Sequence, residues 1–178
     1  HRANEGARRD AKVVLGLMER EYQARGKMRT GRQVGDEVFV VMSFDPALNP
    51  VFTEAISPAI MACGLRAYRV DRAEPEASIT DAILEKIEAA PLVVGDLTFE
   101  RPNCYYELGY ARGIGKRVIL TARKDHDPRS LPRAGDAPRV HFNLDALKIT
   151  WWEDGRLDRM RADLSDRIQE VKNALDTA

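Results

Sequence analysis

Glu107 is the residue whose surroundings suggest chemistry. It lies within "NCYYELGYARGIGKRVIL" (103–120), behind two tyrosines and ahead of a run of small residues. Asn103 is a favourable N-cap and Pro102 has a φ suited to a helix start, so we expect a helix over 103–114 with Glu107 in its first turn and a half. The positive end of the helix dipole favours the ionised carboxylate there. By spacing alone Glu107 is either a solvated helix-start acid or a catalytic carboxylate, and the first is commoner.

Gly109 follows Glu107 inside the predicted helix. A glycine at such a position costs roughly 1 kcal/mol relative to alanine. Close packing of the helix backbone against the sheet or a ligand at Gly109 would compensate for that cost.

The motifs of several common enzyme classes are missing. The chain contains no GxxxxGKS or GxxxxGKT, no GxGxxG after the first predicted strand, no GxSxG and no HExxH, which removes the usual nucleoside triphosphatase, dinucleotide redox, serine hydrolase and zinc protease classes. The histidines are isolated, and we expect the run 125–127 to be a solvated loop rather than a metal site. The acids nearest to the predicted ligand crevice are Glu107, Asp96 and Asp81. A carboxylate can attack an anomeric carbon or stabilise an oxocarbenium-like centre.

Short apolar runs alternate with amphipathic segments along most of the chain. We expect strands at 37–44, 65–70, 91–98 and 116–122, with one or two more at 139–142 and 146–153, and helices at 51–64, 78–90, 103–114 and 155–175. Pro58 within the first of these helices implies a kink or a split. Alternating strands and helices are typical of βαβ units with right-handed crossovers. The sequence therefore predicts an α/β, flavodoxin-like three-layer sandwich with a mainly parallel sheet of four or five strands.

Polar side chains follow the predicted strands, at the edge where an open parallel sheet binds ligands. Asp96 either caps a turn or binds a ribose, and Asp81 pairs with Ser78 at capping-box spacing without needing a ligand. Of Tyr105 and Tyr106, we expect one to stack on a base and the other to fill the core, and we assign Tyr105 to the ligand. The ligand-binding candidates are Ser43, Phe44, Asp71, Asp96, Arg101, Asn103 and Tyr105.

Composition limits the remaining classes of function. The 178 residues contain 28 basic and 28 acidic side chains, so no global basic field attracts nucleic acid and no extended nucleic-acid surface is expected. Two cysteines, with no ligand spacing and no secretory signal, indicate a cytoplasmic protein without a disulfide or a structural metal. No apolar run approaches the roughly 18 residues that cross a bilayer, so no membrane partner is expected.

The amino-terminal part differs from the rest of the chain. Residues 7–25 have the spacing of an amphipathic helix, and three glycines between 26 and 37 indicate a linker. We divide the chain into a helical arm with its linker, 1–36, and an α/β domain, 37–178, that ends in a long amphipathic helix. The apolar faces of the two terminal helices suggest a homo-oligomer.

From 37 to 122 the sequence resembles two related groups of proteins that cut N-glycosidic bonds. One is the nucleoside 2-deoxyribosyltransferase-like superfamily, in which a glutamate is followed by Leu-Gly-Tyr-Ala and a Gly-Lys turn; the matching residues are Glu107, Leu108, Gly109, Tyr110, Ala111, Gly115 and Lys116. The other is the TIR domain family, which the strand "VFVVMSF" and the run "NCYYEL" resemble, with Asn103 in place of that family's tryptophan. The third strand, which ends in "GDLT", resembles the transferase-like group more than the TIR domain family.

The resemblance implies chemistry at a ribose C1′. Glu107 would be the nucleophile or transition-state carboxylate, and Asp81 would orient or protonate the leaving base. Arg101 stands where the transferase-like group often has an acid, and an arginine suits a phosphate better than a sugar hydroxyl. The implied function is hydrolysis or transfer of the N-glycosidic bond of a nucleotide, nucleoside or NAD, with NAD as a substrate rather than a cofactor. The alternative is a non-catalytic TIR-like module that senses a nucleotide or self-associates.

Overall fold

The computed structural model describes residues 35–70, 79–99, 101–127, 129, 140 and 148–177. The helix expected over 7–25 lies outside the described residues. So do Asp71, Ser78 and most of the segment 139–142. The division of the chain at residue 36 therefore stays a prediction.

Five parallel strands form the sheet, in the order β2-β1-β3-β4-β5. All four neighbouring pairs are parallel, and the order is that of flavodoxin-like folds. The predicted fold class is therefore confirmed, with five strands rather than four. The strands are β1 (Glu37–Val41), β2 (Arg66–Tyr68), β3 (Leu92–Asp96), β4 (Arg117–Arg123) and β5 (Ile149–Trp152).

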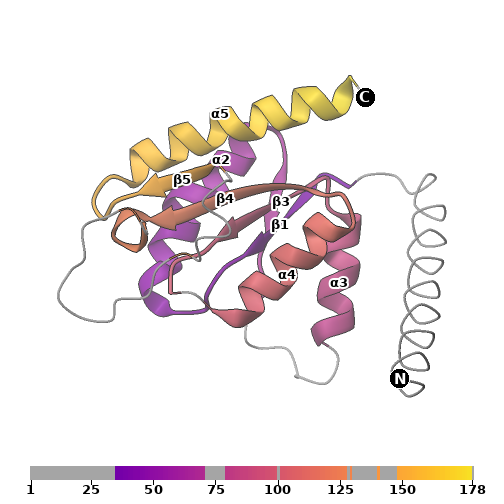
Figure 1. Ribbon diagram of the computed structural model, residues 1–178. Coiled ribbons are helices and arrows are strands. Elements are labelled where there is room, and N and C mark those ends of the chain that lie inside the picture. The colour runs from indigo at the N-terminus through magenta and orange to yellow at the C-terminus, as the bar shows by residue number, and fades with distance from the viewer. Residues whose placement is uncertain are drawn as a thin grey trace, which may run out of the picture. The chain divides into compact units, whose positions relative to one another are not determined.

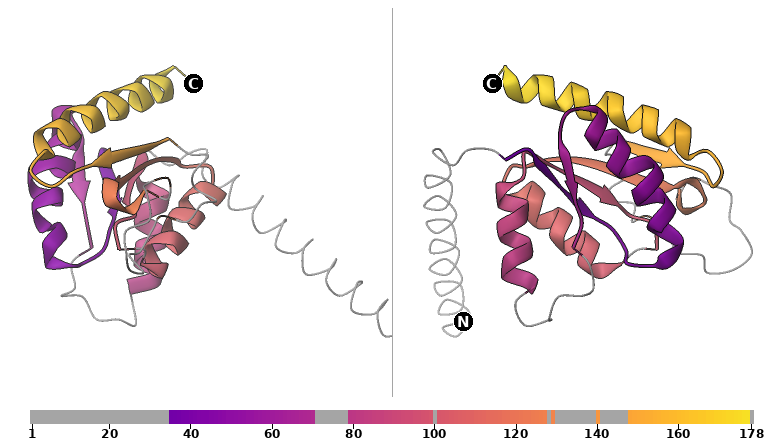
Figure 2. Two further views of the ribbon diagram at one scale, coloured as in Figure 1. Left: turned by 60° about the vertical axis from the view of Figure 1, so that its left-hand side comes forward. Right: turned by 180° about the vertical axis from the view of Figure 1, so that it is seen from behind.

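Helices cover both faces of the sheet, which gives the three layers (Figure 1, Figure 2). α2 and α5 lie on one face, and α3 and α4 lie side by side on the other. None of the described helices combines the length and the apolar character that crossing a bilayer requires. The helical segments are η1 (Pro46–Leu48), η2 (Val51–Ile56), α2 (Ser57–Ala62), α3 (Ile79–Ala89), α4 (Pro102–Gly113), η4 (Lys124–His126) and α5 (Leu157–Asp176).

The two layers of helices enclose two apolar clusters, because successive side chains of each strand point to opposite faces. In β1, Val38 and Val40 face the cluster under α2 and α5, whereas Phe39 and Val41 face the cluster under α3 and α4. All four side chains are buried. Burial on both faces explains why the strand reads as a continuous apolar run rather than an alternating one.

Pro58 divides the helical segment over 51–62 as predicted. η2 is a π-helix, and the backbone N–H of Ser57 bonds to the carbonyl of Phe52, five residues earlier. α2 then begins at Ser57 with Pro58 at its second position. Proline lacks a backbone N–H, so the change from π-helix to α-helix falls where one helical hydrogen bond cannot be made.

Gly109 does not make the close contact with the sheet that was expected for it. A methyl group on Gly109 would meet no described atom within 4 Å, so this exposed position does not bring α4 close to the sheet. The close approach occurs at Gly95 in β3, where a Cβ would lie 2.5 Å from Cδ2 and 3.1 Å from Cγ of Leu108 in α4. Leu108 is itself buried and has little room to yield.

The two glycines should therefore respond to alanine with opposite signs. Gly95→Ala is expected to lower the free energy of unfolding by about 1–3 kcal/mol, because the added methyl overpacks the contact with Leu108. Gly109→Ala is expected to raise it by about 1 kcal/mol, because alanine is the better helix former and the space is open. Urea unfolding of both variants measures the difference, and a Gly95→Ala protein as stable as the wild type would contradict the packing.

Candidate active site

The site lies where the strand order reverses, between β1 and β3. In this fold the loops that leave two such strands diverge and open a crevice at the carboxyl edge of the sheet. Ser43 follows β1 and is buried, whereas Arg101 follows β3 and exposes 55 % of its side chain. Arg101 Nε donates a hydrogen bond to Ser43 Oγ at 3.4 Å, and its guanidinium lies 4.0 Å from the Asp45 carboxylate. The two loops are thus bridged by a partly solvated guanidinium.

α4 begins one residue earlier than predicted. Its first residue is Pro102, and Arg101 is the N-cap with an extended backbone, φ −69° and ψ 123°. Proline forces the preceding residue toward this conformation and suits the first helical position. The prediction of Asn103 as N-cap is therefore wrong: Asn103 is the exposed second residue of the helix, and Glu107 is the sixth.

The pKa of Glu107 is raised, whereas the expected effect of the helix dipole was to favour the ionised carboxylate. The side chain is half-buried, and burial raises the pKa of the carboxyl from 4.5 to about 7. The first turn of α4 holds no acid, and the dipole's influence fades beyond that turn, so desolvation dominates at the sixth residue. Within the described part of the chain, no hydrogen bond or ion pair reaches this carboxylate.

The other residues of the Glu107 motif join α4 to its neighbours. The Tyr110 hydroxyl donates to the Glu88 carboxylate in α3. Lys116 Nζ donates to the carbonyls of Glu88 at 2.6 Å and Ala90 at 2.7 Å, which places a cation at the carboxyl end of α3. Gly115 allows this turn, because its φ of +79° is one that other residues rarely adopt.

Asp96 caps a turn and does not reach the surface. Its side chain is 0 % exposed, and Oδ1 accepts from the backbone N–H of Thr98 at 3.0 Å. Oδ2 accepts from Thr121 Oγ1 at 2.8 Å and from Trp152 Nε1 at 2.9 Å. Burial raises the pKa of this carboxyl, while the three hydrogen bonds oppose the rise. Of the two roles expected for Asp96, the structure favours turn capping and leaves no exposed oxygen for a ribose.

The two adjacent tyrosines differ in exposure. Tyr105 is partly buried against the cluster under α3 and α4, whereas Tyr106 is 60 % exposed. The ligand-stacking role given to Tyr105 stays a prediction. Phe44, after β1, is a second exposed aromatic side chain at the carboxyl edge.

Asp81 lies at the end of α3 that faces the carboxyl edge of the sheet. It is the third residue of α3, which begins at this edge, as does α4. The two helices lie side by side on one face of the sheet (Figure 1). Asp81 and Glu107 therefore lie on neighbouring helices that begin at the same edge of the sheet, although only the backbone of Asp81 is described.

His126 was missed by sequence reasoning. The polar run 125–127 predicts a solvated loop, yet η4 turns the imidazole inward and leaves it 3 % exposed. Its Nδ1 lies 2.7 Å from Asp125 Oδ1, and its ring meets the Phe99 ring edge-on. Nε2 has no hydrogen-bond partner among the described residues. A turn that buries one member of a charged run leaves no signal in hydropathy.

Comparisons with known proteins were made at the level of sequence and structure. The chain matches no protein-family model, and a search of curated proteins finds no significant match. Among solved structures, the CMP N-glycosidase BcmB of Clostridium botulinum superposes with a TM-score of 0.51 at 12 % identity, over 72 % of this chain and 97 % of that one. The TIR domain of the Toll-related receptor TRR-2 from Hydra magnipapillata gives 0.51 at 13 % identity, over 78 % and 98 %.

These likenesses define the fold of the chain. It is the TIR-like and nucleoside-glycosidase-like variant of the flavodoxin-like sandwich. The resemblance seen in the sequence is thereby confirmed for the fold.

The raised pKa of Glu107 predicts a pH-dependent stability. Between about pH 4.5 and about pH 7 the native state binds more protons than the unfolded state, so stability contributed by the protonated carboxyl is lost as the pH rises through 7. Glu107→Gln should match the wild type near pH 4 and become the more stable protein by pH 8. Urea unfolding of both proteins across this range measures the difference.

Glu153 provides a control of opposite sign. Its hydrogen bond to Lys124, at 2.6 Å, lowers the pKa of the carboxyl. The wild type should therefore gain stability over Glu153→Gln as the pH rises through the ordinary range of a glutamate. A Glu107→Gln difference that is independent of pH, or has the sign of the Glu153 control, would contradict the burial of Glu107.

Proposed function

We propose that this protein cleaves the N-glycosidic bond of a nucleotide, nucleoside or NAD, with Glu107 acting at the ribose C1′. The proposal rests on how the contacts of Glu107 differ from those of the other residues in its motif. Leu108, Tyr110 and Lys116 each make a structural contact, and Gly115 has a positive φ that favours glycine, so these four residues have structural roles. Glu107 is half-buried and accepts no hydrogen bond within the described part of the chain. A carboxylate kept in this state is available to a substrate.

The proposed step is a displacement at C1′. A carboxylate oxygen of Glu107 bonds to C1′ while the C1′–N bond breaks, and the base leaves with the electron pair of that bond. Asp81, on the neighbouring helix start, would orient the base or supply its proton. Water then bonds to C1′ and loses a proton while the bond between C1′ and the Glu107 oxygen breaks, and its electron pair restores the carboxylate. Another acceptor in place of water would make the reaction a transfer.

The fold is compatible with this chemistry and also with a module that binds a nucleotide without turnover. One protein of this fold is a CMP N-glycosidase, whereas the other comparison is a TIR domain. A module that binds a nucleotide without turnover remains the second candidate. The partial burial that raises the pKa of Glu107 to about 7 supports the enzyme, because a partly desolvated carboxylate is less shielded by water from a substrate carbon.

Arg101 is proposed to bind a phosphate of the substrate. Its guanidinium is more than half exposed at the switch point of the sheet, and its contacts to Ser43 and Asp45, at 3.4 and 4.0 Å, are long. An arginine presents a planar fork of donors that matches a phosphate. The same side chain has less to offer an uncharged nucleoside, which favours a nucleotide as substrate.

The role of Glu107 is tested by base release. Wild type and Glu107→Gln are incubated with NAD, nucleoside monophosphates and nucleosides, and the free base is followed by chromatography. We expect Glu107→Gln to lower kcat by at least ~10²-fold and the wild-type rate to increase as the pH rises through about 7, because the nucleophile must be ionised. Equal rates for the two proteins would refute the assignment. Saturable binding without released base would instead identify a sensing module.

The role of Arg101 is tested by comparing matched substrates. Arg101→Ala should raise KM for a nucleoside monophosphate by roughly tenfold or more and change KM for the corresponding nucleoside by less than about twofold. Arg101→Lys keeps the charge and loses the fork, so its KM should fall between the two. Equal effects of Arg101→Ala on both substrates would rule out a phosphate contact.

A further inference from the structure

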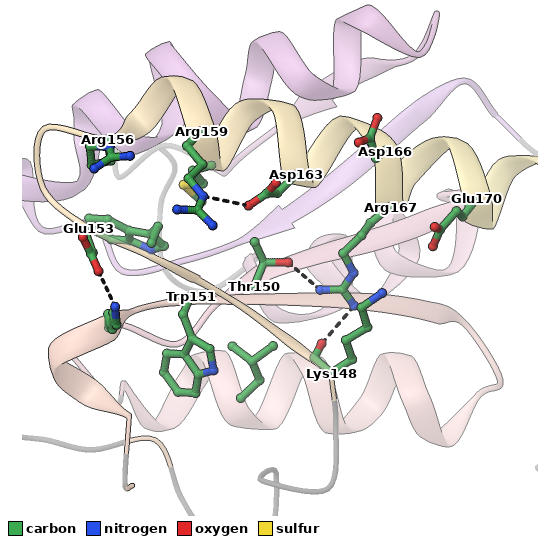
Figure 3. Close-up of a pocket in the computed structure, with 14 residues that line it drawn as sticks. Lys148, Thr150, Trp151, Glu153, Arg156, Arg159, Asp163, Asp166, Arg167 and Glu170 are labelled. Carbon is green, nitrogen blue, oxygen red and sulfur yellow. Dashed lines mark hydrogen bonds and ion pairs between the residues drawn. The ribbon is translucent and has the colours of Figure 1, made fainter. Parts of the chain in front are cut away.

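The apolar face of α5 is buried within the protein. Met160, Leu164 and Ile168 lie in the cluster beneath this helix, so the stripe is not the free surface that was expected to support a homo-oligomer, and the oligomer itself stays a prediction. A groove of about 520 Å³ between α5 and β5 is lined by basic and acidic side chains alike, and Arg167 within it already donates to Thr150 Oγ1 at 2.6 Å (Figure 3). Neither surface points to a partner of one chemical class.

Phe99 has a strained backbone at the edge of the sheet that carries the candidate site. Its φ is +70°, and among the described residues it is the only one other than glycine with a positive φ. A side chain in this left-handed region is crowded by its own backbone, whereas glycine adopts the same conformation freely. Phe99 lies in the connection between β3 and α4, two residues before Arg101. Strain persists only where the surrounding contacts impose it, and such places are often active sites and ligand clamps.

The ring of Phe99 is held by two side chains that follow β4. It meets the ring of His126 edge-on, with 5.8 Å between the centroids, and Cζ of Arg123 lies 5.4 Å from its centroid. One oxygen atom, Asp125 Oδ1, fixes both of these partners, because Arg123 Nε donates to it at 2.8 Å and His126 Nδ1 lies 2.7 Å from it. Aromatic pairs and cation–π contacts of this kind are attractive. They offset the strain at Phe99.

The group that holds the ring is itself anchored on two sides. Lys124 Nζ donates to the carboxylate of Glu153, after β5, at 2.6 Å (Figure 3), and the Arg123 guanidinium lies 3.7 Å from the Asp154 carboxylate. The backbone N–H of Arg123 donates to Thr98 Oγ1 at 3.0 Å, directly before Phe99. The connection is therefore tied to β4 through its backbone neighbour and through the Phe99 ring.

Phe99 and α4 belong to opposite faces of the sheet. The Phe99 ring packs against the cluster under α2 and α5, whereas α4 packs on the other cluster. The chain thus crosses the carboxyl edge of the sheet between Phe99 and Pro102, and Arg101 lies in this crossing. The contacts of Arg101 with Ser43 and Asp45, at 3.4 and 4.0 Å, are long. They are too weak to fix the crossing, so its course depends on the anchor at Phe99.

We propose that Phe99, clamped between Arg123 and His126, is a positioning residue that holds Arg101 at the ligand edge for a substrate phosphate. Phe99 itself does not touch the substrate. An arginine whose backbone is held in place loses less conformational entropy on binding. The effect on substrate rests on the proposed phosphate contact of Arg101, whereas the placement of Arg101 can be measured without any ligand.

Hydrogen exchange of the ligand-free protein tests the placement of Arg101. The backbone N–H of Cys104 donates to the Arg101 carbonyl at 3.0 Å, so its exchange reports on the start of α4. Phe99→Leu removes the aromatic contacts, and Phe99→Gly removes both the contacts and the strain. Both variants should exchange this N–H about fivefold faster or more. Wild-type exchange in Phe99→Gly would show that the backbone conformation alone suffices, which would overturn the clamp.

Calorimetric binding of ribonucleoside monophosphates and the corresponding nucleosides tests the consequence for the substrate. Phe99→Leu should raise Kd for the monophosphate by about fivefold or more and change Kd for the nucleoside by less than about twofold. In an Arg101→Ala background the same substitution should add less than about twofold, because both residues act through one contact. Independent effects of the two substitutions would overturn the role of Phe99. An unchanged Kd in Arg101→Ala alone would instead refute the phosphate contact, and the exchange of the Cys104 N–H would still decide the positioning.

Phe52→Leu is the matched control. Phe52 packs against the same cluster as Phe99, and Cζ of Arg69 lies 4.4 Å from its ring centroid. It lies in η2, away from the connection between β3 and α4, and its φ is not positive. The substitution should therefore leave both the exchange of the Cys104 N–H and the monophosphate Kd unchanged. Thermal melts establish that each variant is folded. Equal effects of Phe52→Leu and Phe99→Leu would indicate a general loss of core packing and would overturn the proposal.

Discussion

The buried carboxylate of Asp96 ties together the edge of the sheet that carries the candidate site. Its oxygens accept hydrogen bonds from the turn after β3, from Thr121 in β4 and from Trp152 in β5. A charged or polar group without exposure is costly unless it is fully bonded, so these partners are obligatory. Thr98 extends the network, because its hydroxyl accepts the backbone N–H of Arg123. Asp96 thus fixes the turn that directly follows β3.

The position of Glu107 follows from the course of the chain between β3 and α4 and from the contacts between α3 and α4. The turn at Asp96 leads to Arg101, and Pro102 then fixes the start of α4. Leu108 packs on Gly95, while Tyr110 and Lys116 bind the end of α3. Pro102 precedes Glu107 along the chain, and the contacts of Leu108, Tyr110 and Lys116 follow it. They hold the backbone of Glu107 in place. Its carboxylate takes part in no hydrogen bond or ion pair within the described part of the chain.

Local patterns predicted the strands and helices because their signals are local. Continuous apolar runs identified strands buried on both faces, and Pro58 identified the break between η2 and α2. The role of Asp96 was not predictable, because its partner Trp152 lies 56 residues away in the chain. The inward turn of His126 likewise depends on Phe99, which has a φ of +70° that no residue preference indicates.

The electrostatics of the candidate site were mispredicted because two local rules compete. Asn103 is the better N-cap by residue type, but Pro102 occupies the first helical position and moves the cap to Arg101. This shift of the N-cap by two residues leaves Glu107 beyond the turn in which the dipole is effective. Burial then dominates and raises its pKa to about 7. A carboxylate that must bond to carbon benefits from such partial desolvation, since fewer water molecules compete for it, and a pKa near neutrality still leaves the ionised form populated.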